Sequence, residues 1–170
     1  MTAATLESCL RASEATATID DCFIQLLDEY ERPLYNFLLV VLRDADAARD
    51  CTQDTYLRAY EHLGHGKPVN RSWLYTVARN RAIDLFRKRK WTEPGSDPLV
   101  SISASSGHER GVEIREALRA LPARDRHIIY LHDVAGFNGR EIAGILGVRA
   151  TTARQRLFRA RERLRAAYLA

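Results

Sequence analysis

The sequence has few prolines and glycines, which break helices, and few cysteines, which could cross-link a small fold through disulfides. It contains five prolines, nine glycines and three cysteines in 170 residues, and no run of about 18 apolar residues, so no membrane insertion is expected. The first twenty residues are polar and lack the apolar segment of a secretory signal. Cys9, Cys22 and Cys51 are odd in number and widely spaced, which argues against a disulfide framework or a thiolate metal site. We therefore expect a cytoplasmic protein.

Charge is segregated along the chain, although the net charge is only +4. Residues 1–66 contain five Lys or Arg against twelve Asp or Glu, whereas residues 67–92 contain eight against one. Residues 93–148 contain six against eight, and residues 149–170 contain seven against one. Two basic stretches separated by acidic ones favour two nucleic-acid contacts on one chain over a pair of solvated helix faces.

The first half of the chain has the apolar periodicity of successive helices, from Thr18 to Trp91. Pro33 is expected to break or kink the first helix, and Asp44 is a suitable N-cap for the second. A third helix is expected from about Val69 to Lys90. Nine of the eighteen residues in 92–109 are Gly, Pro or Ser, a composition typical of a flexible linker. The halves that it joins are expected to be mobile relative to each other.

The second half is also predicted to be helical and contains the pattern of a helix-turn-helix. Pro122 suits the first turn of one helix. Asn138 and Glu141 have the spacing of a capping box at the start of another, and Gly147 stands where the turn needs a positive φ. No segment alternates with period two, so no sheet is predicted.

The last helix, expected over about Ala150 to Tyr168, has one apolar stripe and otherwise basic faces. Counted from Arg149, the end of the chain has seven arginines and no lysine. An arginine fork can bond two acceptors on a guanine edge or a phosphate. The first half of this helix is therefore expected in the major groove of DNA, with Arg161, Arg163 and Arg165 further along the phosphates.

Three stretches of the sequence carry a resemblance to a known family: the run from Asp50 to Tyr60 (DCTQDTYLRAY), the run from Arg71 to Arg89, and the stretch from Ala120 to Arg165. They resemble the extracytoplasmic-function (ECF) sigma factors of bacterial RNA polymerase, within the sigma-70 family. The first resembles their polymerase-binding helix, the second is similar to their promoter-melting, −10-reading helix, and the third to their −35-reading domain. Together these stretches cover roughly residues 22–168 in the order and spacing of the family.

The resemblance implies an all-α fold of two small helical domains joined by a flexible linker. An N-terminal extension (1–21) would precede sigma domain 2 (22–91), a helical bundle for core polymerase and the −10 element. A linker (92–109) would lead to sigma domain 4 (110–170), a helix-turn-helix for the −35 element. The implied protein is an alternative sigma factor that helps initiate DNA melting and is no enzyme, with no cofactor or metal. Its implied partners are promoter DNA, the β′ clamp helices and β flap of core polymerase, and an anti-sigma factor.

The resemblance also implies three groups of site residues. Core polymerase is expected on an acidic, partly apolar face formed by Asp50, Gln53, Asp54, Leu57 and Glu61. The −10 DNA is expected on Lys67, Arg71, Arg79, Asn80, Asp84, Arg87 and Lys88. The −35 DNA is expected on Arg149, Thr151, Thr152, Arg154, Gln155, Arg156, Phe158 and Arg159. The aromatic rings that could stack on bases are Trp73, Tyr75 and Phe86, although a core position is favoured for Trp73 and Phe86.

Two other classes of protein compete with this interpretation. A stand-alone helix-turn-helix regulator would bind duplex DNA as a dimer without polymerase, but it leaves the two N-terminal stretches unexplained. A helical nuclease or recombinase would need a catalytic site. His62 and His65 have no nearby carboxylate pair or cysteine to complete a metal site, and no phosphate-cradling glycine loop is present.

Overall fold

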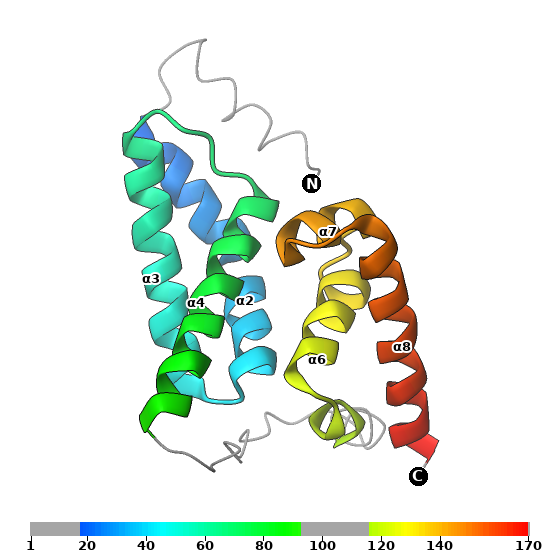
Figure 1. Ribbon diagram of the computed structural model, residues 1–170. Coiled ribbons are helices and arrows are strands. Elements are labelled where there is room, and N and C mark those ends of the chain that lie inside the picture. Colours follow the sequence, from blue (N-terminus) through cyan, green and yellow to red (C-terminus); the bar gives the residue numbers. More distant parts are fainter. Residues whose placement is uncertain (1–17, 93–115, 170) are drawn as a thin grey trace.

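Every regular secondary-structure element of the described residues is a helix. The computed structural model describes residues 18–92 and 116–169, and these two stretches contain no strand. The N-terminal half consists of α2 (Ile19–Leu42), α3 (Ala45–Gly64) and α4 (Arg71–Thr92). The C-terminal half consists of helical residues 116–120, α6 (Ala123–Ile129), the π-helical turn η1 (Tyr130–Val134), α7 (Gly139–Leu146) and α8 (Ala150–Leu169) (Figure 1). None of the helices described is long and apolar enough to cross a membrane.

Local hydrogen bonds set the helix ends in the N-terminal half. Thr18 and Asp21 form a capping box at the start of α2. Asp44 caps α3 through its carboxylate, as predicted, and the side chain of Asn70 accepts a backbone N–H in the first turn of α4. Arg43 ends α2 in the left-handed conformation, with φ of 58°. The resulting tight turn brings α3 back alongside α2 (Figure 1).

Of the two outcomes expected at Pro33, a break or a kink, the break does not occur, because α2 continues through this residue. A proline inside a helix removes one N–H bond and leaves a carbonyl without its donor. Pro33 is exposed, so water can reach the carbonyl groups on this side of the helix. Leu34, Phe37 and Leu38 follow it and have no exposed surface at all. Their burial stabilises the helix on both sides of the proline.

Small residues let the three N-terminal helices approach one another closely. Ala48 and Ala59 of α3, with Ala78 and Ala82 of α4, have no exposed surface. They face the leucines and Phe37 of α2 within one apolar core. A large residue at any of these positions would have to displace its neighbours, since protein interiors are close-packed.

The helix-turn-helix forms between α7 and α8 as the sequence predicts. Asn138 and Glu141 form the capping box of α7, and Gly147 ends the helix with φ of 64°. Ala153 and Ala160 are the buried residues of α8. Pro122 stands at the N-cap of α6 instead of in its first turn, and the following helix closes with a π-helical turn at η1.

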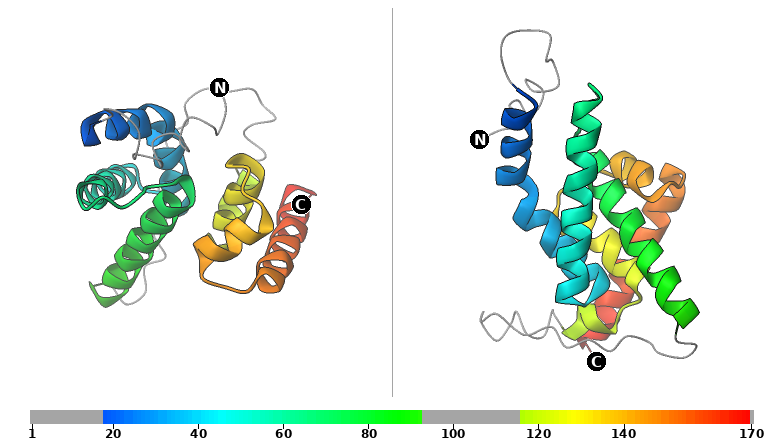
Figure 2. Two further views of the ribbon diagram at one scale, coloured as in Figure 1. Left: turned by 90° about the horizontal axis from the view of Figure 1, so that it is seen from above. Right: turned by 90° about the vertical axis from the view of Figure 1, so that its left-hand side faces the viewer.

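The two halves pack directly against each other in this structure, and the mobility expected from the linker composition stays a prediction. Helix α4 contacts α7, and α2 contacts both α6 and η1; the view from above shows the two halves side by side (Figure 2). Buried residues of both halves belong to a single apolar core. The linker that motivated the expectation lies almost wholly outside the described residues. In this structure the surfaces of the halves are complementary, so their contact does not depend on the composition of the connection.

The positive φ of Gly147 gives a stability prediction. A Cβ at position 147 would meet no atom within 4 Å, so the cost of Gly147→Ala is backbone strain alone, about 1–2 kcal/mol of unfolding free energy. Gly144 lies inside α7 and also has open space around it. Gly144→Ala should instead stabilise the protein by about 0.5–1 kcal/mol. Urea unfolding of both variants measures the difference. Equal shifts for the two would show that φ does not limit the turn.

Candidate nucleic-acid interface

The first half of α8 presents an uncovered basic face. Of the eight residues predicted there, seven are exposed and Thr152 is half-buried. Phe158 is 68% exposed, which is unusual for a phenylalanine and leaves its ring free for contact. Within residues 18–92 and 116–169, no ion pair is formed by the arginines at positions 149, 154, 156 and 159. This stretch of helix therefore carries guanidinium groups that the described part of the protein does not neutralise.

The second half of α8 differs from the expectation. Arg161 forms an ion pair with Asp133, and Arg163 forms one with Asp125, which is only 4% exposed. Burial alone would raise the pKa of Asp133, but hydrogen bonds from Arg161 and His132 hold the pKa below its ordinary value. Two arginines that we expected along phosphates thus bind α8 to α6 and η1.

The predicted −10 residues on α4 divide into an exposed set and a covered set. Lys67, Asn80, Asp84, Arg87 and Lys88 are exposed, the first of them in the loop before the helix. Arg71 and Arg79 are half-buried. The structure therefore keeps most of the predicted −10 face open and covers part of it.

Both half-buried arginines lie near the other half of the molecule. The guanidinium carbon of Arg71 lies 3.8 Å from the ring centroid of Phe137, a cation–π contact. The Nε of Arg79 is buried without a hydrogen-bond partner. Burial lowers the pKa of Arg79, and the nearby positive charge of Arg156 lowers it further. The basic helices α4 and α8 thus bring like charges near each other.

The three aromatic residues considered for base stacking have different surroundings. Tyr75 is 2% exposed, so it cannot stack on a base in this conformation. Trp73 is half-buried and stacks on His62, with ring centroids 4.6 Å apart. Phe86 is half-buried against the core. Trp73 and Phe86 thus pack against the core, the position favoured from the sequence, and both remain partly exposed.

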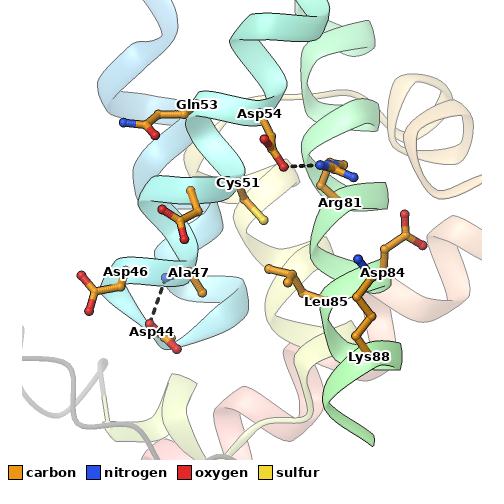
Figure 3. Close-up of a pocket in the computed structure, with 11 residues that line it drawn as sticks. Asp44, Asp46, Ala47, Cys51, Gln53, Asp54, Arg81, Asp84, Leu85 and Lys88 are labelled. Carbon is orange, nitrogen blue, oxygen red and sulfur yellow. Dashed lines mark hydrogen bonds and ion pairs between the residues drawn. The ribbon is translucent and has the colours of Figure 1, made fainter. Parts of the chain in front are cut away.

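A groove of about 610 Å³ between α3 and α4 joins residues from two predicted sites (Figure 3). Asp50, Gln53 and Asp54 of the predicted polymerase face line one wall. Asp84 and Lys88 of the predicted −10 face line the other. Asp54 is bound by Arg81 of α4, a partner that sequence reasoning missed. The remaining members of the polymerase face are outside the groove, and Leu57 is 64% exposed.

Sequence reasoning also missed two buried residues of α6, Arg126 and His127. Both are 7% exposed, and Arg126 donates hydrogen bonds to carbonyl oxygens of α2. Burial, followed by the charges of Arg79 and Arg126, lowers the pKa of His127 to about 3. The sequence held one indication that these residues are buried: they directly precede the apolar residues Ile128, Ile129 and Tyr130 in the same helical segment.

Known proteins share both halves of this chain. Residues 26–92 match the family model of sigma-70 region 2, and residues 111–164 match that of sigma-70 region 4. The ECF RNA polymerase sigma factor SigM of Bacillus subtilis is 34% identical over 161 residues, which cover 89% of this chain and 95% of SigM. The chain belongs to the ECF sigma factors. SigL of Mycobacterium tuberculosis H37Rv is 32% identical over 166 residues, 91% of this chain and 93% of SigL.

Solved structures agree with the family assignment. The sigma factor RpoE of Bartonella quintana, in complex with the anti-sigma factor NepR, has a TM-score of 0.72 and 30% identity over 85% of this chain and 95% of its own. CnrH in complex with the cytosolic domain of CnrY shares the fold, with a TM-score of 0.64 and 23% identity. These findings confirm the predicted family, all-α fold and sigma-factor function. They give no support to the stand-alone regulator.

The buried His127 of this sigma factor should make its stability depend on pH. With a folded pKa of about 3 against an ordinary 6.5, the unfolded chain binds a proton that the folded chain does not, between these two pH values. Stability is therefore lost as pH falls below 6.5, by about 2 kcal/mol between pH 7 and pH 5.

Replacing the histidine should remove this loss. The unfolding free energies of both proteins, wild type and His127→Gln, should be measured with urea at pH 7, 6 and 5. Between pH 7 and pH 5 the wild type should lose about 2 kcal/mol more than His127→Gln. His65→Gln, at an exposed loop position, is the control. Parallel pH profiles of wild type and His127→Gln would rule out a neutral buried imidazole.

Proposed function

We propose that this sigma factor reads the −35 element with the first half of α8, holds the −10 strand along α4, and binds core polymerase through α3. The observation that supports this proposal best is the row of exposed arginines on α8, which form no ion pair with any described residue. Such a row needs an anionic partner, and duplex DNA is the partner that a helix-turn-helix fits.

The proposed −35 contacts follow from the chemistry of the exposed side chains. Arg154 and Arg159 can each donate two hydrogen bonds to a guanine edge. Gln155 can bond an adenine in the same way, and the exposed ring of Phe158 can lie against a thymine methyl group. Arg149, Arg156 and the hydroxyl groups of Thr151 and Thr152 suit phosphate contacts near the helix start.

The proposed −10 site lies on the exposed part of α4. Lys67, Arg87 and Lys88 supply positive charge for the backbone of a single strand. Asn80 and Asp84 offer an amide and a carboxylate that can bond the edge of a base turned out of the stack. Arg71 and Arg79 would join this set once they leave the C-terminal half.

Core polymerase is proposed to bind the outer face of α3. Asp50, Gln53 and Glu61 are exposed there, next to the apolar side chain of Leu57. Carboxylates around an apolar centre suit a partner surface with basic residues around an apolar strip, here the β′ clamp helices. Asp54 contributes negative charge although Arg81 already binds it. The β flap is the proposed partner of domain 4.

An anti-sigma factor is a further proposed partner. RpoE, the structural relative that is 30% identical, was solved in complex with the anti-sigma factor NepR. The two halves of this chain pack into one body with exposed basic and acidic faces, so an inhibitor could cover both halves at once. The residues that lose solvent exposure when the anti-sigma factor binds would show which of these faces it covers.

The polymerase face is tested by reversing a charge that has no role within the fold. Asp50 is exposed, whereas Asp54 is tied to Arg81, so Asp50→Lys is the cleaner variant. It should weaken binding to purified core polymerase at least tenfold, about 1.4 kcal/mol or more. Asp28→Lys, exposed on α2, makes the same change in net charge and should bind normally. Fluorescence anisotropy with labelled sigma factor measures both. Equal affinities would remove α3 as the docking face.

The −35 helix is tested with holoenzyme on a promoter located by mapping its transcripts. Arg154→Ala or Arg159→Ala should cost about 1–3 kcal/mol and relax the preference at one or two base pairs of the −35 element. Arg165→Ala, at the far end of α8, should weaken binding to all sequences alike. Mobility shifts with single-base-pair promoter variants separate the two effects. Unchanged base preference in both variants would contradict base reading by these arginines.

A further inference from the structure

We infer that a cavity beside the C-terminal end of α2 binds a small carboxylate that has an apolar body. The cavity has a volume of about 210 Å³. Of the described residues that line it, four lie in the last two turns of α2 or directly after them, two belong to the helical residues 116–120, and one belongs to α6. None of them is part of the proposed DNA or polymerase sites, so the inference does not depend on the function proposed above.

The volume of the cavity is suited to a small molecule. An apolar cavity of about 150 Å³ in another protein is large enough to bind benzene, whereas pockets for drug-sized ligands measure about 300–1,000 Å³. The cavity beside α2 lies between these sizes. It therefore has room for a single ring or a short alkyl chain with one polar head, and is too small for a docked helix or strand of a partner protein.

One wall of the cavity is apolar. Leu39, Val40 and Leu118 line it, and all three are partly buried side chains that pack against the buried core. Because protein cores are close-packed, a wall supported in this way changes its shape little. The apolar body of a ligand would lose its contact with water against this wall, which favours binding through the hydrophobic effect.

The other lining residues give the cavity a positive charge. Arg43, Arg119 and Arg126 line it, and none of the described lining residues is a carboxylate. Arg126 donates hydrogen bonds to the carbonyl oxygens of Val40 at 3.1 Å and Val41 at 3.4 Å. A carbonyl accepts a hydrogen bond without cancelling the charge of the donor, and here the bonds cover carbonyls at the negative end of the α2 dipole. The cavity therefore favours an anionic ligand over a cationic one.

The side chain of Arg43 indicates where the charged head of the ligand lies. Its Nη1 donates to the carbonyl oxygen of Arg119 at 3.2 Å. Its Nε is buried and has no hydrogen-bond partner among the described residues. A buried donor without an acceptor costs free energy. A carboxylate oxygen would supply the missing acceptor, and a bond between two charged groups is stronger than one to a neutral oxygen.

The backbone of Arg43 is a second, independent indication of a ligand site. Arg43 has φ of 58°, and no other non-glycine residue within residues 18–92 and 116–169 has a positive φ. This conformation costs free energy for a residue with a side chain, and such strain concentrates at binding and catalytic sites. A glycine would form the same turn without that cost, but it would leave the cavity without the guanidinium group.

The test compares small ligands that differ only in the head or the body. Hexanoate and benzoate are the two carboxylate probes, with an alkyl chain and a ring respectively. Hexanol has the alkyl chain without the charge, and hexylammonium has the opposite charge. The full-length protein is titrated with each of them in a chloride buffer, and binding is followed by two-dimensional nitrogen–proton NMR, which resolves the Nε–H groups of arginines as well as the backbone amides.

We expect at least one of the two carboxylates to bind saturably, about tenfold or more tightly than hexanol, and hexylammonium not to bind. The signals that move should include the Nε–H of Arg43 and the amides of Leu39 and Leu118. The acid that binds more tightly shows whether the cavity prefers an alkyl chain or a ring.

Two variants and a matched control locate the binding. Arg43→Gln removes the charge and the Nε donor, so it should weaken binding of the carboxylate about tenfold or more. Val40→Phe fills part of the cavity without changing any charge, and should weaken binding of both carboxylates and hexanol. Arg32→Gln removes the same charge from an exposed position of α2 and should bind as wild type does. Urea unfolding checks that the variants are folded, and Val40→Phe decides the location if Arg43→Gln is not.

Four results would overturn the inference. They are the absence of saturable binding by either carboxylate, equal affinities for hexanol and the carboxylates, equal losses in Arg43→Gln and Arg32→Gln, and wild-type affinity in Val40→Phe. Signals that move only at residues away from the cavity would show that the carboxylate binds elsewhere, and would overturn it as well.

Discussion

The carbonyl groups at the C-terminal end of α2 need donors, because the last turn of a helix has no following N–H groups to bond them. Arg43 satisfies one locally, by turning into the left-handed region so that its own N–H reaches the carbonyl of Leu39. Arg126 satisfies two more from the other half of the chain. The end of α2 is thus the point at which the turn into α3, the position of α6 and the contact between the domains are fixed together.

How far the sequence predicts this structure depends on whether a feature is local. Asp44, Asn138 and Gly147 were assigned correctly, since a cap or a turn is determined by residues a few positions apart. The helix is not broken at Pro33, because the penalty of the proline is local, whereas the burial that outweighs it comes from distant helices. The role of Arg126 could not be predicted, because the carbonyl groups of α2 that it binds, those of Val40 and Val41, are far from it in the sequence.

The charges of the candidate sites also divide into what the sequence predicts and what only the packing determines. Counting residues in 149–170 gives a strongly basic helix, but it cannot distinguish the arginines that remain exposed from those bound to Asp125 and Asp133. That distinction needs the packing of α8 against α6 and η1. The groove between α3 and α4 could not be predicted either, because it depends on how α4 crosses α3 and on the bond between Asp54 and Arg81.

A sigma factor faces two opposing physical requirements, and both act on the same basic surface. Uncovered arginines give affinity for any DNA, since the phosphate term is independent of sequence, and a chain that exposes all of them would be distributed over non-promoter DNA. When aromatic residues of the protein cover part of that surface, its affinity for DNA of any sequence is lower. Promoter binding then loses free energy as well, because the same contacts must be broken first. Arg71 on Phe137 is such an exchange, since the ring accepts the cation without neutralising it. The guanidinium group of Arg71 therefore keeps its full positive charge while it lies against the ring.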